Sequence, residues 1–341
     1  MKNKILLIGN IPGKNVNSIG GANTYTYALL KKLKSSDLIE LDFIKIRFFW
    51  FKYGQVIDYI FFPFRFLFKI HKYDVISIHA TWDFHLTIGP FIVFVSRLLG
   101  KKVIYHFFGG KFHKVYQSLP ELIKKYLDLT ILKSDYKLME TKRMIEFFKE
   151  HKRRDGFIWF PNSRDKVDSE QKTYSKKFVF ISRVTPNKGI DYIIEAIDVL
   201  DGKYTVDIYG PIDRNFYNNS FDKQTFYKGV LSSDEVISTL QCYDVLVLPT
   251  FHPGEGYPGI FIEAMSVGMP IIATKWNALD ELIVDEYNGK LIEIKSTSDL
   301  VNAIKFFNEN NYQTLSNNSL IKFNDFDINL MSKKIIDLYL C

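Results

Sequence analysis

The sequence predicts an α/β protein built from two doubly wound parallel-sheet domains that face a central cleft. Its 341 residues exceed one ordinary domain and suit two domains of roughly 150 residues each. Short apolar runs alternate with longer stretches of helical periodicity, which is typical of parallel sheets covered by helices. This alternation stops at a polar segment near residue 163 and then starts again, so we expect two such domains.

The N-terminal domain is expected over residues 1–165. Its strand-like runs are KILLIG (4–9), DVISIHA (74–80), KKVIYHF (101–107) and YKLMET (136–141). Helical patterns lie between them, for example NTYTYALLKKLK (23–34) and LPELIKKYLDLTIL (119–132). The first run lacks the cleavage pattern of a signal peptide, so we interpret it as the first strand.

The C-terminal domain is expected over residues 176–325. Its strand-like runs are KKFVFISR (176–183), YTVDIYG (204–210), DVLVLPT (244–250) and PIIATK (270–275). The segment SRDKVDSEQKTYS (163–175) is polar and aperiodic, so it is expected to be a linker between the domains. Residues 326–341 are expected to form a final helix that can pack back on the N-terminal domain.

The composition is that of a soluble globular protein, with 47% hydrophobic and 24% charged residues. The two cysteines, Cys242 and Cys341, have no CxxC or Cys/His cluster around them, so neither a disulfide framework nor a zinc site is expected. No apolar stretch approaches the roughly 20 residues of a membrane span. These features favour a cytoplasmic location.

Charge is distributed unevenly along the chain. Residues 1–160 contain 27 Lys and Arg against 13 Asp and Glu, whereas the remainder contains 18 against 25. A basic first half favours an anionic partner, either nucleic acid or anionic lipid. No RNP, zinc-finger or helix-turn-helix signature is present, so we expect no nucleic acid partner.

The stretch RFFWFKYGQVIDYIFFPFRFLFKIHKYD (47–74) mixes aromatic residues with Arg47, Lys52, Arg65, Lys69 and Lys72. One interpretation is a peripheral surface that contacts anionic lipid at the inner face of the cell membrane, with rings at the headgroup level and cations on phosphates. The other is an ordinary strand edge and core-packing helix with lysine stems along apolar surface. The sequence leaves both interpretations open.

Three motifs directly follow expected strands, where doubly wound sheets bind their ligands. In the first, Gly20-Gly21 precedes a helix whose free N–H groups can hold a phosphate. This motif is not GxGxxG, and no GxxxxGK[ST] occurs in the chain, so dinucleotide-type and P-loop binding are disfavoured. A tight turn between strand and helix is the simpler alternative.

The second motif is FISRVTPNKG (180–189), in which Arg183 ends a strand and Lys188-Gly189 opens a helix. The guanidinium fork and the ammonium point charge together suit a diphosphate. The alternative is two solvated surface charges, but cations at a helix N-terminus oppose the helix dipole. We therefore favour a binding role.

The third motif is EGYPGIFIEAMSVGMP (255–270), in which Pro258 fits the first turn of a helix and the terminal Gly-Met-Pro fits its end. Glu255 then lies in the preceding loop, where it can reach a sugar hydroxyl. Glu263 lies in the helix, where its two oxygens can accept hydrogen bonds from a ribose diol. Its neighbours are apolar, which argues against an ordinary solvated glutamate.

In these positions the chain resembles the retaining glycosyltransferases of the GT-B fold known as family 4, or glycosyl transferases group 1. The resemblance rests on Gly20-Gly21, Pro161-Asn162, Arg183 with Lys188-Gly189, Tyr209-Gly210-Pro211, Lys228-Gly229, Leu248-Pro249-Thr250, Glu255 with Glu263, and Asn288-Gly289. It implies two Rossmann-like domains. The C-terminal domain would hold most of the nucleotide-sugar donor, and the N-terminal domain most of the acceptor.

The resemblance also implies roles for single residues. Arg183 and Lys188 would neutralise the departing diphosphate, Glu263 would hold the ribose, and Glu255 would contact the donor sugar. The implied donor site further includes Gly20, Gly21, Gly210, Gly256, Tyr257, Pro258, Gly259 and Ile260. Because the family usually needs no metal, we expect neither a metal ion nor another cofactor.

One departure from the family concerns the N-terminal domain. The family often has a histidine directly before a glycine near the reacting sugar, whereas HFFGGKF (106–112) has Phe108 there. His106 lies two residues earlier, on the same strand face as Phe108. It is therefore either a catalytic candidate or a core histidine, and Lys111 and His113 are reserve candidates.

The expected function is transfer of a hexose-type sugar from a nucleoside-diphosphate sugar, with a UDP-sugar as the expected donor. The expected acceptor is a glycan or lipid-linked oligosaccharide in lipopolysaccharide or capsule biosynthesis. Two alternatives remain, a nucleotide-sugar epimerase or hydrolase of the same fold, and a non-catalytic scaffold subunit. The intact set of charged residues in the second and third motifs argues against the scaffold.

Overall fold

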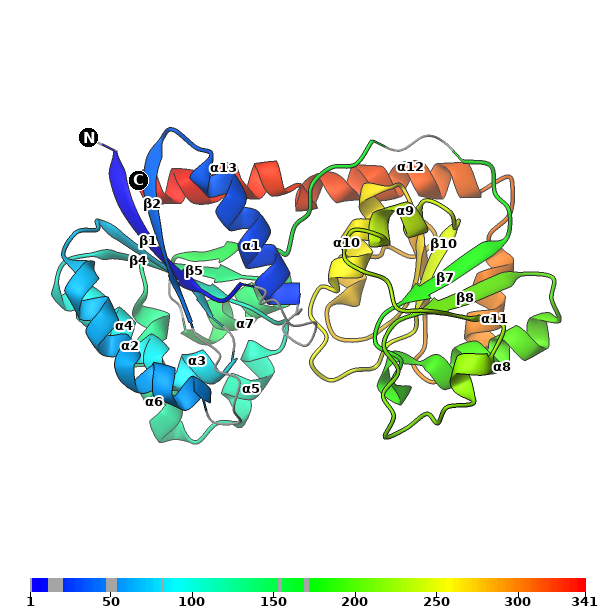
Figure 1. Ribbon diagram of the computed structural model, residues 1–341, viewed down its shortest axis with the longest axis horizontal. Coiled ribbons are helices and arrows are strands. Elements are labelled where there is room, and N and C mark those ends of the chain that lie inside the picture. Colours follow the sequence, from blue (N-terminus) through cyan, green and yellow to red (C-terminus); the bar gives the residue numbers. More distant parts are fainter. Residues whose placement is uncertain (1, 12–20, 47–53, 81, 153–154, 169–171) are drawn as a thin grey trace. The chain divides into compact units, whose positions relative to one another are not determined.

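The computed structural model describes residues 2–11, 21–46, 54–80, 82–152, 155–168 and 172–341. These residues form two compact units (Figure 1). Unit 1 comprises Met1–Ser163 and Ile328–Cys341, and unit 2 comprises Arg164–Asp327. Each unit contains a six-stranded parallel sheet with helices on both faces. The predicted α/β architecture of two doubly wound domains is therefore confirmed.

The sheet of unit 1 has the strand order β2-β1-β3-β4-β5-β6. Its strands are β1 (Asn3–Gly9), β2 (Ile39–Lys45), β3 (Val75–Ala80), β4 (Lys102–Phe107), β5 (Tyr136–Met139) and β6 (Phe157–Trp159). The central β3 is buried along its whole length, whereas β2 at the edge mixes buried and exposed residues. This difference explains why the apolar runs predicted the inner strands but missed the two edge strands.

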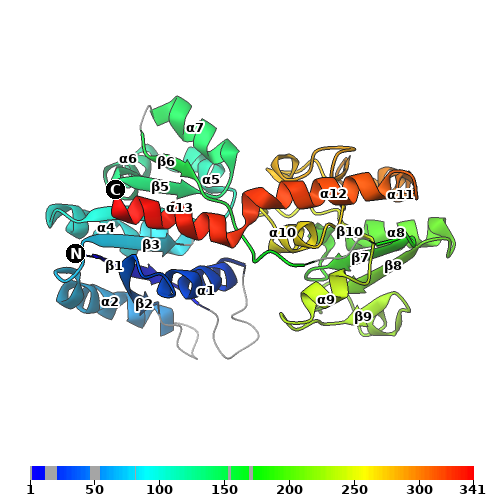
Figure 2. The same ribbon diagram turned by 90° about the horizontal axis from the view of Figure 1, so that it is seen from above.

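Two helical layers cover the sheet of unit 1 (Figure 2). One face packs against α2 (Gly54–Ile70), α3 (Trp82–Leu86), α4 (Ile88–Leu98), α5 (Phe112–Ser118), α6 (Glu121–Leu129), η2 (Ile131–Lys133) and α7 (Lys142–Lys152). The other packs against α1 (Gly21–Lys34) and the C-terminal α13 (Ile328–Leu340). Tyr339 of α13 is fully buried and donates a hydrogen bond to Ser77 Oγ at 2.9 Å. The last helix is therefore part of the core of unit 1.

The sheet of unit 2 has the order β12-β11-β10-β7-β8-β9. Its strands are β7 (Lys177–Ile181), β8 (Thr205–Tyr209), β9 (Tyr227–Gly229), β10 (Val245–Leu248), β11 (Ile271–Thr274) and β12 (Gly289–Ile292). From β7 the chain first builds outward to β9 and then returns to the other side of β7 with β10. The loops after β7 and β10 consequently diverge, which is where doubly wound sheets bind ligands.

Helices also cover both faces of the sheet of unit 2. One face carries α8 (Ile190–Leu200) and α11 (Thr297–Phe306); the other carries α9 (Val236–Leu240), α10 (Gly259–Ser266) and α12 (Tyr312–Phe323). Short 3₁₀ turns complete the unit, namely η3 (Pro186–Lys188), η4 (Phe221–Lys223), η5 (Leu279–Glu281) and η6 (Asn324–Phe326).

The segment expected to be a linker packs along unit 2. Within its described residues it contains neither a helix nor a strand. Arg164 N donates to the carbonyl oxygen of Phe326 at 3.0 Å, and Ser175 N donates to Asp244 Oδ2 at 2.9 Å. The segment is therefore fixed to unit 2 at both ends rather than extending freely.

Helix length also bears on membrane insertion. Of the helices built from described residues, none combines the length and the apolar character that crossing a bilayer requires.

Candidate active site

The second and third motifs meet at the carboxyl edge of the sheet of unit 2 through one charged residue each. Lys188 ends η3 in the loop after β7, and Glu255 lies in the loop after β10. Lys188 Nζ forms an ion pair with Glu255 Oε2, and the two side chains are 15% and 11% exposed. Two residues 67 positions apart are thus joined at the point where the strand order reverses.

Thr250 supports this ion pair from the end of β10. Its hydroxyl donates to Glu255 Oε2 at 2.8 Å, and its carbonyl oxygen accepts a hydrogen bond from Thr274 at the end of β11. Because the carboxylate is held by both an ammonium and a hydroxyl group, its orientation does not depend on Lys188 alone. Lys188 can therefore turn to another anion while Thr250 keeps Glu255 in place.

The loop that carries Glu255 is anchored by neighbouring loops. Asn277 Nδ2 donates to the carbonyl oxygen of Glu255 at 3.1 Å, and Trp276 Nε1 donates to that of His252 at 2.8 Å. On the other side, Phe251 N donates to the carbonyl oxygen of Asn187 at 2.9 Å. These bonds preorganise the backbone that precedes α10.

Glu263 lies in α10, as the sequence predicted. Its Oε1 accepts a hydrogen bond from Arg164 Nε at 2.6 Å, and the two side chains are 21% and 15% exposed. No donor among the described residues bonds to its second oxygen, Oε2. That oxygen can accept a hydroxyl of a bound ligand while Arg164 holds the carboxylate.

The backbone from Gly256 to Ile260 leads into α10, whose N-cap is Pro258. The first N–H groups of a helix have no partner within it, so this end of α10 suits an anion. The Tyr257 side chain points inward, since it is buried and donates to Glu281 Oε2. At this position only the backbone can face a ligand.

Arg183 and Gly210 lie at the ends of β7 and β8. Arg183 is exposed, and no hydrogen bond or ion pair joins its guanidinium to any residue that the structure describes, so it is available to an anion. Gly210 has φ +145°, and an added Cβ would overlap the carbonyl oxygen of Ser182. A close backbone approach therefore requires glycine here whether or not this residue contacts a ligand.

Unit 1 contains further candidate site residues from the sequence motifs. Gly20 lies outside the described residues, and Gly21 is the first residue of α1. Lys111 is exposed and caps α5, in which His113 is half-buried. Burial lowers the pKa of His113 to about 4.

His106 lies in the core of unit 1, on β4. Its ring is 4.1 Å from that of Phe108 between centroids, so the predicted shared strand face is confirmed. The side chain is 1% exposed and lies among the rings of Tyr25, His79 and Phe160. Burial, and then the neighbouring His79, hold its pKa well below the usual range. This position favours a neutral core histidine over a residue that contacts substrate.

Two features of the site go beyond the expected residues. Arg164 lies in the segment expected to be a linker, and its partner lies 99 residues away, so no local pattern reveals the contact. The second feature has a visible signal, because GEGYPG (254–259) has GxGxxG spacing and its last glycine is the first residue of α10. That spacing allows close approach of the backbone to a ligand phosphate.

The structure also bears on whether the protein has a metal site. Within the described part of the chain, no group of three or more His, Cys, Asp and Glu side chains is placed to hold a metal ion.

Comparison with known proteins identifies the class. Residues 162–322 match the family model for glycosyl transferases group 1, which covers unit 2 almost from end to end. The chain therefore carries a glycosyl transferases group 1 domain, and it is an enzyme of the glycosyltransferase class, as the sequence predicted.

Relatives are similar over most of the chain. A galactosyltransferase of Escherichia coli, described as UDP-Gal:alpha-D-GlcNAc-diphosphoundecaprenol alpha-1,3-galactosyltransferase, is 25% identical over 80% of this chain and 77% of its own length. An uncharacterised 41.2 kDa protein from the cps region of Klebsiella pneumoniae is 26% identical over 71% and 72%. HepE of Anabaena, solved with UDP and glucose, has a TM-score of 0.70 at 16% identity over 98% and 99%, which supports the same fold.

Proposed function

We propose that this glycosyltransferase moves a sugar from a UDP-sugar to a glycan on a lipid carrier, with retention at the anomeric carbon, as a family 4 enzyme of surface polysaccharide biosynthesis. The observation that carries the proposal is the ion pair of Lys188 with Glu255 at the strand-order reversal of unit 2, in the loop that leads into the helix of Glu263. The carrier-linked substrate in the name of the Escherichia coli relative and the UDP bound to HepE support the two substrates.

The proposed donor lies along the edge that these residues define. The diphosphate would meet Arg183, Lys188 and the N-terminus of α10, and the ribose diol would meet Oε2 of Glu263. Glu255 would then contact the sugar ring. On this proposal the bond from the anomeric carbon to the diphosphate oxygen breaks, and a bond to an acceptor hydroxyl oxygen forms on the same face of the sugar. The proton of that hydroxyl passes to the departing diphosphate, whose negative charge the cations stabilise.

The proposal does not require a metal ion. Two side-chain cations and a helix N-terminus can together neutralise a diphosphate, which is the role that Mg²⁺ has in other transferases. A lipid-linked acceptor also implies that the enzyme works at a membrane surface, so peripheral association with the inner face of the cell membrane belongs to the proposal.

Calorimetric titration with UDP and GDP, with and without Mg²⁺, tests the donor site. We expect UDP to bind without Mg²⁺ and Glu263→Ala to weaken that binding roughly ten- to hundredfold, because hydrogen bonds to a charged acceptor are lost. Glu255→Gln should lose turnover but still bind UDP. Binding of GDP alone would change the proposed donor. No nucleotide binding by the wild type would overturn the proposal.

Product analysis tests the reaction itself. A transferase releases UDP from the UDP-sugar only in step with sugar transfer to the acceptor. Equal UDP release without an acceptor would instead support a hydrolase of the same fold, or an epimerase that also hydrolyses its product.

A further inference from the structure

Helix α2 exposes apolar side chains along its outer face. Its buried face packs Phe62, Phe66 and Ile70 into the core of unit 1. The outer face carries large apolar residues at helical spacing, namely Ile57 (40% exposed), Ile60 (59%), Phe61 (59%), Phe64 (59%), Leu67 (45%) and Phe68 (77%). A helix that is apolar all round is normally buried, so this exposed face is incomplete without a partner.

Helix α4 extends the same surface. It packs beside α2 in the same core cluster of unit 1, and it exposes Phe94 and Leu98, followed by Leu99. Leu98 is 74% exposed although it ends a helix whose other face is buried. We call the exposed apolar residues of α2 and α4, together with Leu99, the α2–α4 face.

The charges around the α2–α4 face are almost all positive. The helices and the turns that follow them carry Arg65, Lys69, Lys72, Arg97 and Lys101. Within the described residues of α2 and α4 the one carboxylate is Asp58, which is buried and paired with Arg65. Arg97 faces Asp135, whereas Lys69, Lys72 and Lys101 form no ion pair with any residue that the structure describes. Apolar rings beside such unpaired cations are complementary to a surface with an apolar interior and an anionic rim.

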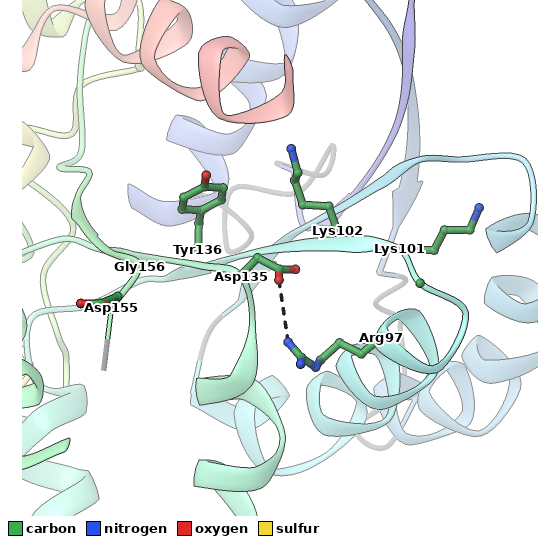
Figure 3. A pocket seen from close by; sticks show the side chains of 8 residues that line it. Arg97, Lys101, Lys102, Asp135, Tyr136, Asp155 and Gly156 are labelled. Carbon is green, nitrogen blue, oxygen red and sulfur yellow. Dashed lines mark ion pairs between the residues drawn. The ribbon is translucent and has the colours of Figure 1, made fainter. Parts of the chain in front are cut away.

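A basic pocket adjoins the end of α4. It has a volume of about 680 Å³ and lies at the amino ends of β4, β5 and β6. Its lining includes Arg97, Lys101 and Lys102 together with Asp135 and Asp155. In Figure 3, Arg97 points toward Asp135, with Nη1 3.8 Å from Oδ1, whereas Lys101 and Lys102 point away from the two carboxylates. The pocket directly follows the exposed Leu98 and Leu99 in the chain, as a headgroup site beside an acyl layer would.

We propose that the α2–α4 face docks on an anionic lipid bilayer, with the phenylalanines among the headgroups and the flanking cations on lipid phosphates. A second copy of the chain is a less suitable partner for this face. In a symmetric dimer, the cations of one copy would lie opposite the same cations of the other copy. The sequence leaves two interpretations of this stretch open, and on this proposal both apply to α2. Its inner side packs in the core, and its outer side contacts lipid. The link to a lipid-linked acceptor rests on the proposed function; the docking does not.

Vesicle sedimentation with the full chain tests the docking. We expect wild type to bind phosphatidylglycerol-containing vesicles and not phosphatidylcholine vesicles, with binding that weakens as salt is raised. The double variant Phe64→Gln/Phe68→Gln should bind at least tenfold more weakly, because two apolar contacts with the bilayer are removed. Lys69→Glu/Lys72→Glu should also release the protein. Phe216→Gln is the matched control, since Phe216 is 63% exposed in unit 2.

Two outcomes would overturn the docking. One is equal vesicle binding by wild type and the double variants. The other is absent vesicle binding together with a wild-type dimer that the Phe64→Gln/Phe68→Gln variant breaks, which would make the face a subunit interface. UDP titration on the same variants separates the two proposals. Unchanged UDP affinity with lost vesicle binding supports docking, whereas wild type that binds vesicles but no UDP would overturn only the proposed function.

Discussion

At the scale of single residues, the candidate site pairs each of its two glutamates with a cation from a distant part of the chain. Glu255 is held by Lys188 and Thr250, and Glu263 is held by Arg164. Both pairs are partly buried, so removing one partner leaves a poorly solvated charge. The pairs differ in purpose, because Lys188 has to meet a diphosphate in the proposed complex whereas Arg164 can stay on Glu263.

Arg164→Ala should weaken UDP binding by about tenfold, because a charge-assisted hydrogen bond that orients Glu263 is lost. Arg164→Lys should restore part of the affinity, since it keeps the charge but not the Nε geometry. Calorimetric titration measures both. Arg214→Ala is the control, because Arg214 forms an exposed ion pair with Asp222 in the same unit. Unchanged UDP affinity in a folded Arg164→Ala variant would mean that Arg164 does not position Glu263.

At the scale of elements, the loops that follow β7 and β8 are tied together by backbone hydrogen bonds. Ser182 N donates to the carbonyl oxygen of Tyr209 at 3.1 Å, and Val184 N donates to that of Pro211 at 2.9 Å. The chain turns between these bonds at Gly210, against the carbonyl oxygen of Ser182. This contact fixes where Arg183 leaves the sheet.

Gly210→Ala should lower the free energy of unfolding by about 3 kcal/mol or more, because the new methyl group adds a clash to an unfavourable φ. Gly202→Ala is the matched control, since Gly202 also has positive φ (+69°) but open space around it. That control should cost only about 1–2 kcal/mol. Urea denaturation measures both variants. Equal losses of stability would show that the contact with Ser182 relaxes without cost.

At the scale of the whole molecule, the chain crosses between its two units twice, and both crossings lie together. They fall at Ser163–Arg164 and at Asp327–Ile328, and Arg164 forms a parallel bridge with Asp327. Arg164 therefore belongs to the crossing point through its backbone and to the candidate site through its side chain. The last helix contributes to the core of unit 1, so that unit is built from two stretches far apart in the sequence.

Acid should destabilise the protein through the interior histidines of unit 1. Burial lowers the pKa of His79 to about 3, and burial lowers that of His85 to about 3 against the opposing effect of Asp83. These rings stay neutral in the folded state but gain a proton in the unfolded state below about pH 6.5. Stability is thus full above that pH and falls as the pH drops toward 3, by up to about 1.4 kcal/mol per histidine and pH unit.

Urea denaturation across this pH range, followed by tryptophan fluorescence, measures the effect. His85→Phe should flatten the slope of stability against pH, whatever it does to stability at neutral pH. His71→Gln is the control, because His71 is exposed. Stability that does not change between neutral and acidic pH would contradict the prediction.

The sequence by itself determined the fold class and the position of both glutamates of the candidate site. Apolar runs alternating with helical patterns identified the inner strands of both sheets, because a strand buried on both faces must be apolar throughout. Glycine, proline and glutamate spacing placed Glu255 in a loop and Glu263 in α10, because helix ends obey local rules of backbone geometry.

Only the tertiary structure decided the remaining features, because each depends on residues distant in sequence. Arg164 meets Glu263 across 99 residues. His106 is buried by α1 and the segment after β6, neither of which marks it in the sequence. The phenylalanines of α2 alternate between core and surface within one apolar run, and burial is set by which side faces the sheet. Local sequence specifies an element, whereas its neighbours are specified only when the chain has folded.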